Sequence, residues 1–280
     1  MTPQQQDGPG ESAVRDFMVY VINARALVEM TVGSAGFTLH ISNTMRGSYE
    51  KIGLGPVDEH DNSSVGRLAS TAASEIANDF PLLHAHSLVG LWGAFEACID
   101  GICESWLAHV SPEQVGERLG RLKVPLGEFL LLPVDDRWHW VVDQLKKEKG
   151  SELKKGIGQF ESVLDVLGLG GPVNEHVRKT LYVAKSFRNV IAHKGGRADA
   201  RLLEDCAELP FKPGESIKLS GSQLMAAYTA MVLYAETVQE RARHAARLPA
   251  MGIHLPPWIT SEEELVPMVL GSAETTLDLV

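Results

Sequence analysis

The feature that most constrains the fold is a long apolar stripe in the middle of the chain. From about Leu82 onward, apolar residues recur every three or four positions, which is the repeat of an α-helix and not of a β-strand. This pattern predicts a helix over residues 82–110, which Ser111 and Pro112 end. Alternating apolar patterns are nearly absent from the chain, so we expect an all-α protein. The stripe consists of Leu88, Leu91, Trp92, Phe95, Ile99, Ile102, Trp106 and Val110.

Further helices are predicted from the same spacing and from residues that begin or end helices. Serine, threonine, asparagine and aspartate favour the start of a helix, whereas glycine favours its end. The predicted helices are 12–31, 65–79, one from Pro112, 135–149, 156–169, 172–193, and a last one from Ser220 or Ser222 to 248. Residues 33–64 and 197–219 are interpreted as loops, Phe37–Ile41 as a short strand, and 116–132 fits either a helix or a loop.

The chain divides into one main helical domain with an extension at each end. Residues 1–81 form an N-terminal extension made of a disordered start (1–11), a helix, a loop and a second helix. Residues 82–248 form the helical domain. Residues 249–280 form an acidic C-terminal tail, whose last twenty residues hold four Glu, one Asp and no Lys or Arg.

Composition indicates a soluble, cytoplasmic protein. Of the 280 residues, 44% are hydrophobic, and no run of eighteen apolar residues predicts a membrane span. The polar start of the chain lacks the charged and apolar regions of a secretory signal. Cys98, Cys103 and Cys206 form no CxxC pair, which fits reduced thiols in the cytosol.

Charge is distributed unevenly along the chain. The net charge is -10, and a uniformly acidic surface would repel nucleic acid. Residues 172–201 nevertheless hold seven Lys or Arg against two acids, a local charge of about +5. The rest of the chain therefore carries about -15.

The segment SFRNVIAHKGG, residues 186–196, concentrates the residue types that carry chemistry. At about 100° per residue, the apolar residues from Val183 to Ile191 fall on one face of a helix. On the opposite face Asn189 lies one turn before His193, so the two can touch. Gly195 and Gly196 leave space around the helix end. The polar face consists of Lys185, Arg188, Asn189 and His193.

This set suits cleavage of a phosphodiester bond in RNA. Histidine can take or give a proton near neutral pH, and the arginine fork matches phosphate oxygens. The 2'-hydroxyl of RNA is an internal nucleophile, so such an enzyme needs no metal. The alternative is a solvated helix face whose cations complement the helix dipole.

Residues 82–247 resemble the HEPN superfamily, and more narrowly the larger bacterial RiboL-PSP-HEPN-like proteins. RNVIAH closing a helix matches the family's Rx4-6H motif, and it follows a long helix of the type LVGLWGAFEACIDGICESWL. Residues 1–81 and 249–280 fall outside the resemblance. It implies an up-and-down helical bundle and a metal-independent endoribonuclease, commonly a toxin or an antiviral defence effector.

The resemblance also implies roles for individual residues. Arg188 would bind the scissile phosphate, Asn189 would orient His193, and His193 would act as acid and base. Glu96 on the earlier long helix would hold the arginine, and Lys185 would support the site. The expected partners are RNA, a second copy of the chain with the 172–193 helices near the two-fold axis, and an antitoxin or defence protein. The alternative is a catalytically inactive helical module for RNA binding or protein assembly.

Other signals favour structural roles, and we expect neither a metal nor a cofactor. His84 and His86 lie two residues apart, so on a helix they do not face each other. The run GLGGP, residues 168–172, lacks the flanking strand and the Lys-Ser/Thr of a phosphate-binding loop and is interpreted as a helix break. The basic run 146–155 fits a solvated helix end, and Trp92, Trp106, Trp138 and Trp140 are assigned to the core.

Overall fold

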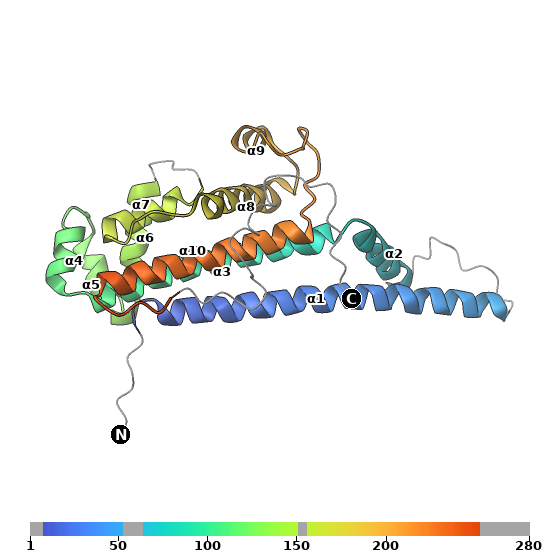
Figure 1. Ribbon diagram of the computed structural model, residues 1–280, viewed down its shortest axis with the longest axis horizontal. Coiled ribbons are helices and arrows are strands. Elements are labelled where there is room, and N and C mark those ends of the chain that lie inside the picture. Colours follow the sequence, from blue (N-terminus) through green and yellow to red (C-terminus); the bar gives the residue numbers. More distant parts are fainter. Residues whose placement is uncertain (1–7, 53–63, 151–155, 253–280) are drawn as a thin grey trace, which may run out of the picture.

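The computed structural model describes residues 8–52, 64–150 and 156–252. The described residues form ten α-helices and one 3-10 helix, with no β-strand beyond an isolated bridge between Arg197 and Ser216 (Figure 1). The predicted all-α bundle is thus confirmed. The helices are α1 (Glu11–Lys51), α2 (Ser64–Ala77), α3 (Pro81–His109), α4 (Pro112–Leu119), α5 (Leu126–Leu131), the 3-10 helix η1 (Val134–Asp136), α6 (Arg137–Gly150), α7 (Gly158–Leu167), α8 (Glu175–Lys194), α9 (Ala200–Asp205) and α10 (Gly221–Ala245).

The predicted central helix is α3, and it forms the core of the bundle. It contacts α1, α6, α7, α8 and α10, and the apolar stripe is buried from Leu88 to Trp106. By length and composition α3 could cross a membrane, and in the described structure it packs among five other helices. Trp92 and Trp106 are buried, whereas Trp138 and Trp140 pack half-buried at the edge.

Helix α10 lies beside α3 and runs in the same direction (Figure 1). Ser220 caps α10 through a capping box with Gln223. In the first turn of α3, the ring Nδ1 of the buried His84 lies 3.0 Å from the carbonyl oxygen of Leu219. His84 thus joins the beginnings of the two helices, while His86 is exposed.

The prediction for residues 33–51 is wrong, because α1 continues unbroken to Lys51. Neither the loop nor the strand at Phe37–Ile41 forms, and residues 53–63 of the predicted loop lie outside the described residues. Glycines and β-branched residues disfavour helix locally, but packing against α2 along one face favours it. Hydroxyl groups also bond back to the carbonyl four residues earlier, from Thr31, Ser34, Thr38, Thr44 and Ser48.

The first turns of α1 belong to the bundle core. Val14, Phe17 and Val21 are buried against α3, so the N-terminal extension is packed onto the helical domain. Glu11 also forms an ion pair with Arg243 in the last turn of α10. The first and last helices of the described chain are therefore joined at one end of the bundle.

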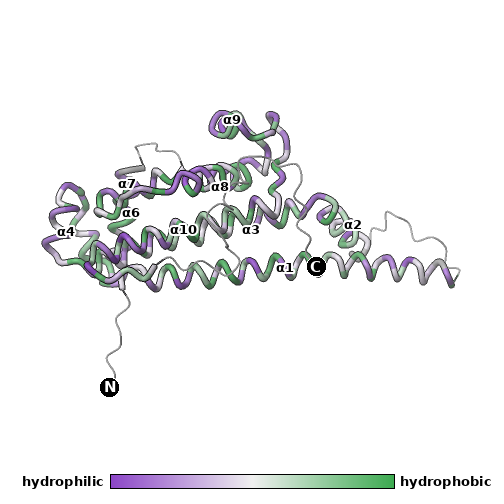
Figure 2. Tube along the Cα trace, in the orientation of Figure 1, coloured by the Kyte–Doolittle hydropathy of each residue, from purple (hydrophilic) through white to green (hydrophobic). Residues whose placement is uncertain are grey.

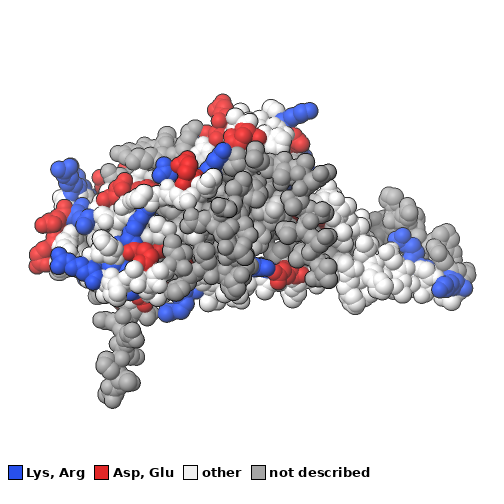
Figure 3. Space-filling model, viewed as in Figure 1, with Lys and Arg blue, Asp and Glu red and all other residues white. Residues whose placement is uncertain are grey.

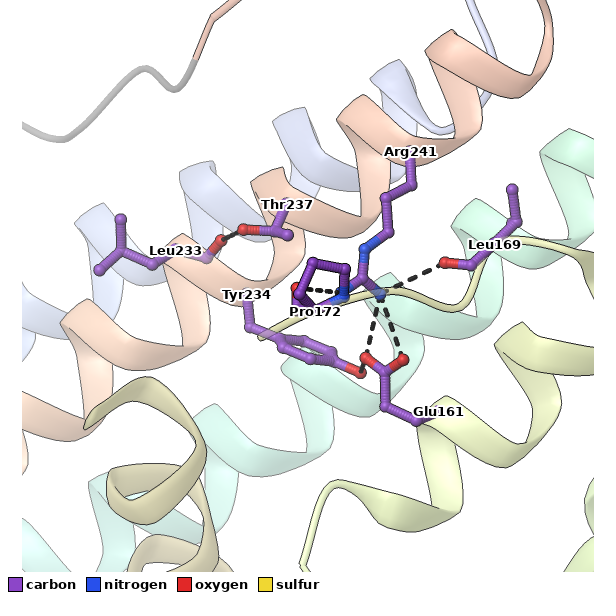
Figure 4. Close-up of polar contacts among 7 residues, drawn as sticks. All are labelled: Glu161, Leu169, Pro172, Leu233, Tyr234, Thr237 and Arg241. Atoms are coloured by element: carbon purple, nitrogen blue, oxygen red, sulfur yellow. Dashed lines mark hydrogen bonds and ion pairs between the residues drawn. The ribbon is translucent and has the colours of Figure 1, made fainter. Parts of the chain in front are cut away.

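A cluster of polar side chains fixes the break between α7 and α8 (Figure 4). Arg241 of α10 donates to both carboxylate oxygens of Glu161, at 3.0 and 3.2 Å, and to the carbonyl oxygens of Leu169 and Pro172. Tyr234 donates to the same carboxylate at 2.7 Å. Residues 168–172 are thus a break held against α10, as the sequence predicted.

Two local predictions differ from the structure. Helix α8 begins at Glu175 and not at Pro172, because the side chain of Asn174 accepts hydrogen bonds from the backbone N–H groups of His176 and Val177. Residues 197–219 include the short helix α9, which Asp199 caps. Residues 1–7, the segment 151–155 of the basic run, and the tail 253–280 lie outside the described residues.

Candidate functional site

Helix α8 positions the motif because its apolar face is firmly held. Val183, Ala184, Phe187 and Val190 are buried, as the spacing predicted. Gly195 adopts a left-handed φ of 61°, and the N–H of Gly196 bonds to the carbonyl oxygen of Val190. This is a glycine-based helix end, and it leaves the last turn of α8 accessible.

Arg188 lies between the motif and α3. Its Nη2 lies 3.7 Å from Glu96 Oε2, and its Nη1 donates to Asn189 Oδ1 at 3.1 Å. The Nε of Arg188 is buried and has no hydrogen-bond partner among the described residues. Both side chains of the ion pair keep contact with solvent, with 27% of Arg188 and 32% of Glu96 exposed. The guanidinium is thus held by one long ion pair and one hydrogen bond, and it keeps part of its surface in solvent while its Nε does not.

His193 is exposed in the last turn of α8 and lines a pocket of about 310 Å³. Asn189 and Lys185 line the same pocket, whereas Arg188 and Glu96 do not. The structure therefore brings three of the five predicted site residues to one pocket and the other two together beside it. Asn189 connects the two groups, because it lines the pocket and accepts the hydrogen bond from Arg188.

Lys185 forms the wall of the pocket toward α7. Its Nζ donates to the carbonyl oxygen of Gly156 at 3.1 Å and to Gln159 Oε1 at 2.7 Å. Burial lowers the pKa of Lys185, while Glu96 opposes that effect. Gln159 and Glu96 also line a neighbouring cavity of about 430 Å³ between α3, α6 and α7. Lys185 thus links the site to the start of α7.

The sequence did not reveal the wall of the pocket that α9 supplies. Asp199, Arg201 and Asp205 line it, and Arg201 Nε lies 3.7 Å from Asp205 Oδ2. Tyr182 faces the pocket as well, and burial together with the charge of Asp205 raises the pKa of its hydroxyl to about 12. One sequence signal could have revealed this wall. Asp199 precedes an apolar pair, and an aspartate in that position favours the start of a helix.

The charge around this pocket is more balanced than the net charge of residues 172–201, the basic segment of the sequence. Lys185, Lys194 and Arg201 contribute three positive charges, against the carboxylates of Asp199 and Asp205. The remaining bases of residues 172–201 include Lys179, which lies 3.8 Å from Glu208. In the part of the chain that the structure describes, no three His, Cys, Asp or Glu side chains group as metal ligands would. The chemistry available is that of a histidine, an amide and an arginine.

Comparison of the chain with protein-family models, with curated proteins and with solved structures finds no match.

Proposed function

We propose that this chain is a metal-independent endoribonuclease of the HEPN type, acting in the cytoplasm as a toxin or defence effector. The observation that carries the proposal is the geometry of one helix end. His193 is exposed and lines a pocket, Asn189 lies one turn before it in the same pocket, and the partly exposed Arg188 donates a hydrogen bond to Asn189.

In this reaction His193 moves the protons. It takes the proton of the 2'-hydroxyl as that oxygen attacks the adjacent phosphorus, and the bond from phosphorus to the 5' oxygen breaks. The leaving oxygen gains a proton, from His193 of a second copy if the two motifs meet in one cleft, or from water. The products are a 2',3'-cyclic phosphate and a 5'-hydroxyl, and DNA lacks the nucleophile.

Arg188 stabilises the negative charge that develops on the phosphate oxygens. Glu96 keeps the guanidinium at the edge of the site, and Asn189 bonds to Nη1, so the fork is oriented before substrate binds. The bound phosphate would lie over Asn189, between Arg188 and His193. A lysine could not reproduce this paired donation.

The second candidate is a catalytically inactive module for RNA binding or protein assembly. It is favoured by the contact of Arg188 with Glu96, which a purely structural arginine would also make. In that case His193 is a solvated residue at the helix end, where a cation complements the dipole.

One incubation separates the two functions. Purified wild-type protein and the His193→Ala variant are incubated with total RNA in EDTA, and the 3' ends of the products are analysed. We expect wild-type cleavage with cyclic phosphate ends, and about a hundredfold less from the variant. Intact RNA with both proteins, or equal cleavage by both, would favour the inactive module, and rescue by Mg²⁺ would exclude the proposed mechanism.

A further inference from the structure

The distal half of α1 is a helix with an uncovered apolar face. Figure 1 shows it extending past the ends of α3 and α10, where α2 is the one described helix that packs against it. We name the segment Met30–Lys51 together with α2 the arm. The large buried side chains of α1 all precede Met30, and in the arm only Ala69 and Ala72 of α2 are buried among the residues whose burial is described. The arm therefore has almost no core of its own.

The uncovered face is apolar from Leu27 to Ile52, apart from two serines. At about 100° per residue, one exposed stripe of α1 covers roughly 80° of the helix circumference, opposite the face that packs on the bundle and α2. The exposed Asp16 and Asn23 lie on the same arc near the start of the helix, and from Leu27 onward the arc holds only apolar residues and two serines. Met30 and Phe37 are 63% and 65% exposed. This stripe consists of Val19, Leu27, Met30, Ser34, Phe37, Ile41, Met45, Ser48 and Ile52, and apolar residues recur along α1 in Figure 2.

The polar atoms of the stripe are already satisfied. The hydroxyls of Ser34 and Ser48 donate to carbonyl oxygens of their own helix at 2.8 and 2.9 Å, so carbon atoms face outward. Residues 30–45 contain no Lys, Arg, Asp or Glu, and the middle of the arm is mostly white in Figure 3. From Leu27 to Ile52 the stripe can therefore be dehydrated without leaving a charge or a hydroxyl unpaired.

The exposed apolar area of the stripe is close to the area that each partner buries in a stable dimer. Its exposed side chains together offer on the order of 700 Å² of apolar surface, against roughly 800 Å² per partner in a standard interface. The largest apolar patch on a typical monomer is only about 300–600 Å². The helix also contains Gly33, Gly36 and Gly47, and each glycine in a helix interior lowers helix stability by about 1 kcal/mol. Packing of a second face of α1 against a partner would offset this loss.

The order of residues along the stripe fits a second copy of the same chain. We place two stripes antiparallel, with a two-fold axis between Ala35 and Gly36. Large side chains of one copy then lie opposite smaller or more slender side chains of the other. Ser34 then faces Phe37 of the second copy, and Met30 faces Ile41. Val19 faces Ile52 in the same register, Ser48 faces Asn23, and Leu27 and Met45 are offset from each other by one residue, about 1.5 Å along the axis.

We propose that the chain forms an antiparallel homodimer through this stripe, in which two arms pack as a four-helix assembly. Helix α8 lies on the other side of the bundle from α1 (Figure 1), so this interface leaves the candidate site accessible and is separate from the pairing of α8 helices that the family resemblance implies. The inference does not depend on the proposed ribonuclease function.

Sedimentation equilibrium of the full chain tests the interface. Phe37→Glu should raise the dimer dissociation constant at least about a hundredfold, because each dimer would bury two unpaired carboxylates. Leu131→Glu is the matched control, since Leu131 is 87% exposed on α5. Ser34→Phe should also weaken the dimer, because two large side chains would meet. A wild-type monomer at about 100 µM, or unchanged association of both arm variants, would refute the proposal.

Engineered disulfides test the direction of pairing. The three native cysteines are buried and give little background. In the antiparallel register Met30 of the two copies is separated by about 16 Å along the axis, so Met30→Cys alone should not cross-link. Met30→Cys combined with Ile41→Cys should. Cross-linking of the single variant would indicate a parallel pair and overturn the register.

A membrane is the alternative occupant of the stripe. Flotation with phosphatidylcholine and phosphatidylglycerol vesicles distinguishes it, because Ser34→Phe would strengthen membrane binding and weaken the dimer. A monomer that floats with vesicles and loses this binding in Phe37→Glu would replace the dimer with a membrane contact.

Discussion

Two arginine–glutamate contacts in this molecule differ in how completely the fold uses the arginine. Arg241 reaches Glu161 at 3.0 Å and two backbone carbonyl oxygens, and its side chain is only 14% exposed. Arg188 reaches Glu96 at 3.7 Å and a neighbouring amide, and it is 27% exposed. The first guanidinium is engaged on several sides, whereas the second keeps an unsatisfied Nε.

The difference identifies which cation is available for a ligand. Removing Arg241 would leave a largely buried carboxylate and two carbonyl oxygens without donors, so its role is to hold the bundle together. Removing Arg188 would leave Glu96 in contact with water, which can solvate it. Arg188 can therefore exchange a weak ion pair for a phosphate at little cost to the fold.

The largest expected effect is on stability at Arg241. Arg241→Ala should lower the free energy of unfolding by about 2–4 kcal/mol, because breaking a buried pair leaves the other charge uncompensated. Urea denaturation followed by circular dichroism measures this. Arg188→Ala is the matched control and should cost at most about 1 kcal/mol. Equal losses from the two variants would remove the distinction between the two contacts.

The next effect is on catalysis at the end of α8. His193→Ala should reduce RNA cleavage about a hundredfold and leave the melting temperature nearly unchanged, because the side chain is exposed and its loss opens no cavity. Cleavage assays and thermal melts of the same preparations give both numbers. A folded variant that cleaves like wild type would end the ribonuclease hypothesis.

Smaller changes should follow from altering how Arg188 is held. Arg188→Lys keeps the charge but loses the fork, so we expect roughly a tenfold or greater loss of cleavage. Glu96→Gln should cost less, since Asn189 still binds Nη1. The kcat and KM of each variant are compared on one RNA substrate. A Glu96→Gln loss larger than that of Arg188→Lys would mean that the glutamate has a direct role.

The smallest effect belongs to a third and more exposed contact, between His139 and Glu104. The hydrogen bond to the carboxylate raises the pKa of His139 above its ordinary value, against a smaller effect of desolvation. The stability it gives is fully present below about pH 6.5 and is lost as the pH rises through the folded pKa. Glu104→Gln should remove most of this pH dependence, worth a few tenths of a kcal/mol, in urea titrations between about pH 5 and 8, and Asp143, 3.8 Å from His139 Nε2, should keep the rest.

The sequence predicted the parts of the fold that local patterns determine. The stripe of α3, the buried face of α8 and the cap at Ser220 all follow from helical spacing and from the hydrogen bonds of helix ends. The distal half of α1 could not be predicted in this way. Its glycines and serines favour a loop, and contact with α2 outweighs that local preference.

The candidate site was predictable only along α8. Asn189, His193 and Lys185 share one helix, so their spacing alone predicts that they lie together. The wall that Asp199, Arg201 and Asp205 provide depends on how α9 folds back over α8. That return is set by pairing of backbone groups near Ala198 with those near Glu215, which leaves no periodic trace in the sequence.

The ion pair of Glu11 with Arg243 joins residues 232 positions apart, and this has a consequence for synthesis on the ribosome. The bundle cannot close until α10, the last helix of the described chain, has emerged. Until then α3 lacks one of its main neighbours, although it is apolar enough to resemble a membrane span. From the synthesis of α3 until that of α10, the nascent chain therefore leaves the α10-facing side of its most apolar helix uncovered, and a chaperone or targeting factor that scans for such segments would meet α3 before α10 can cover it.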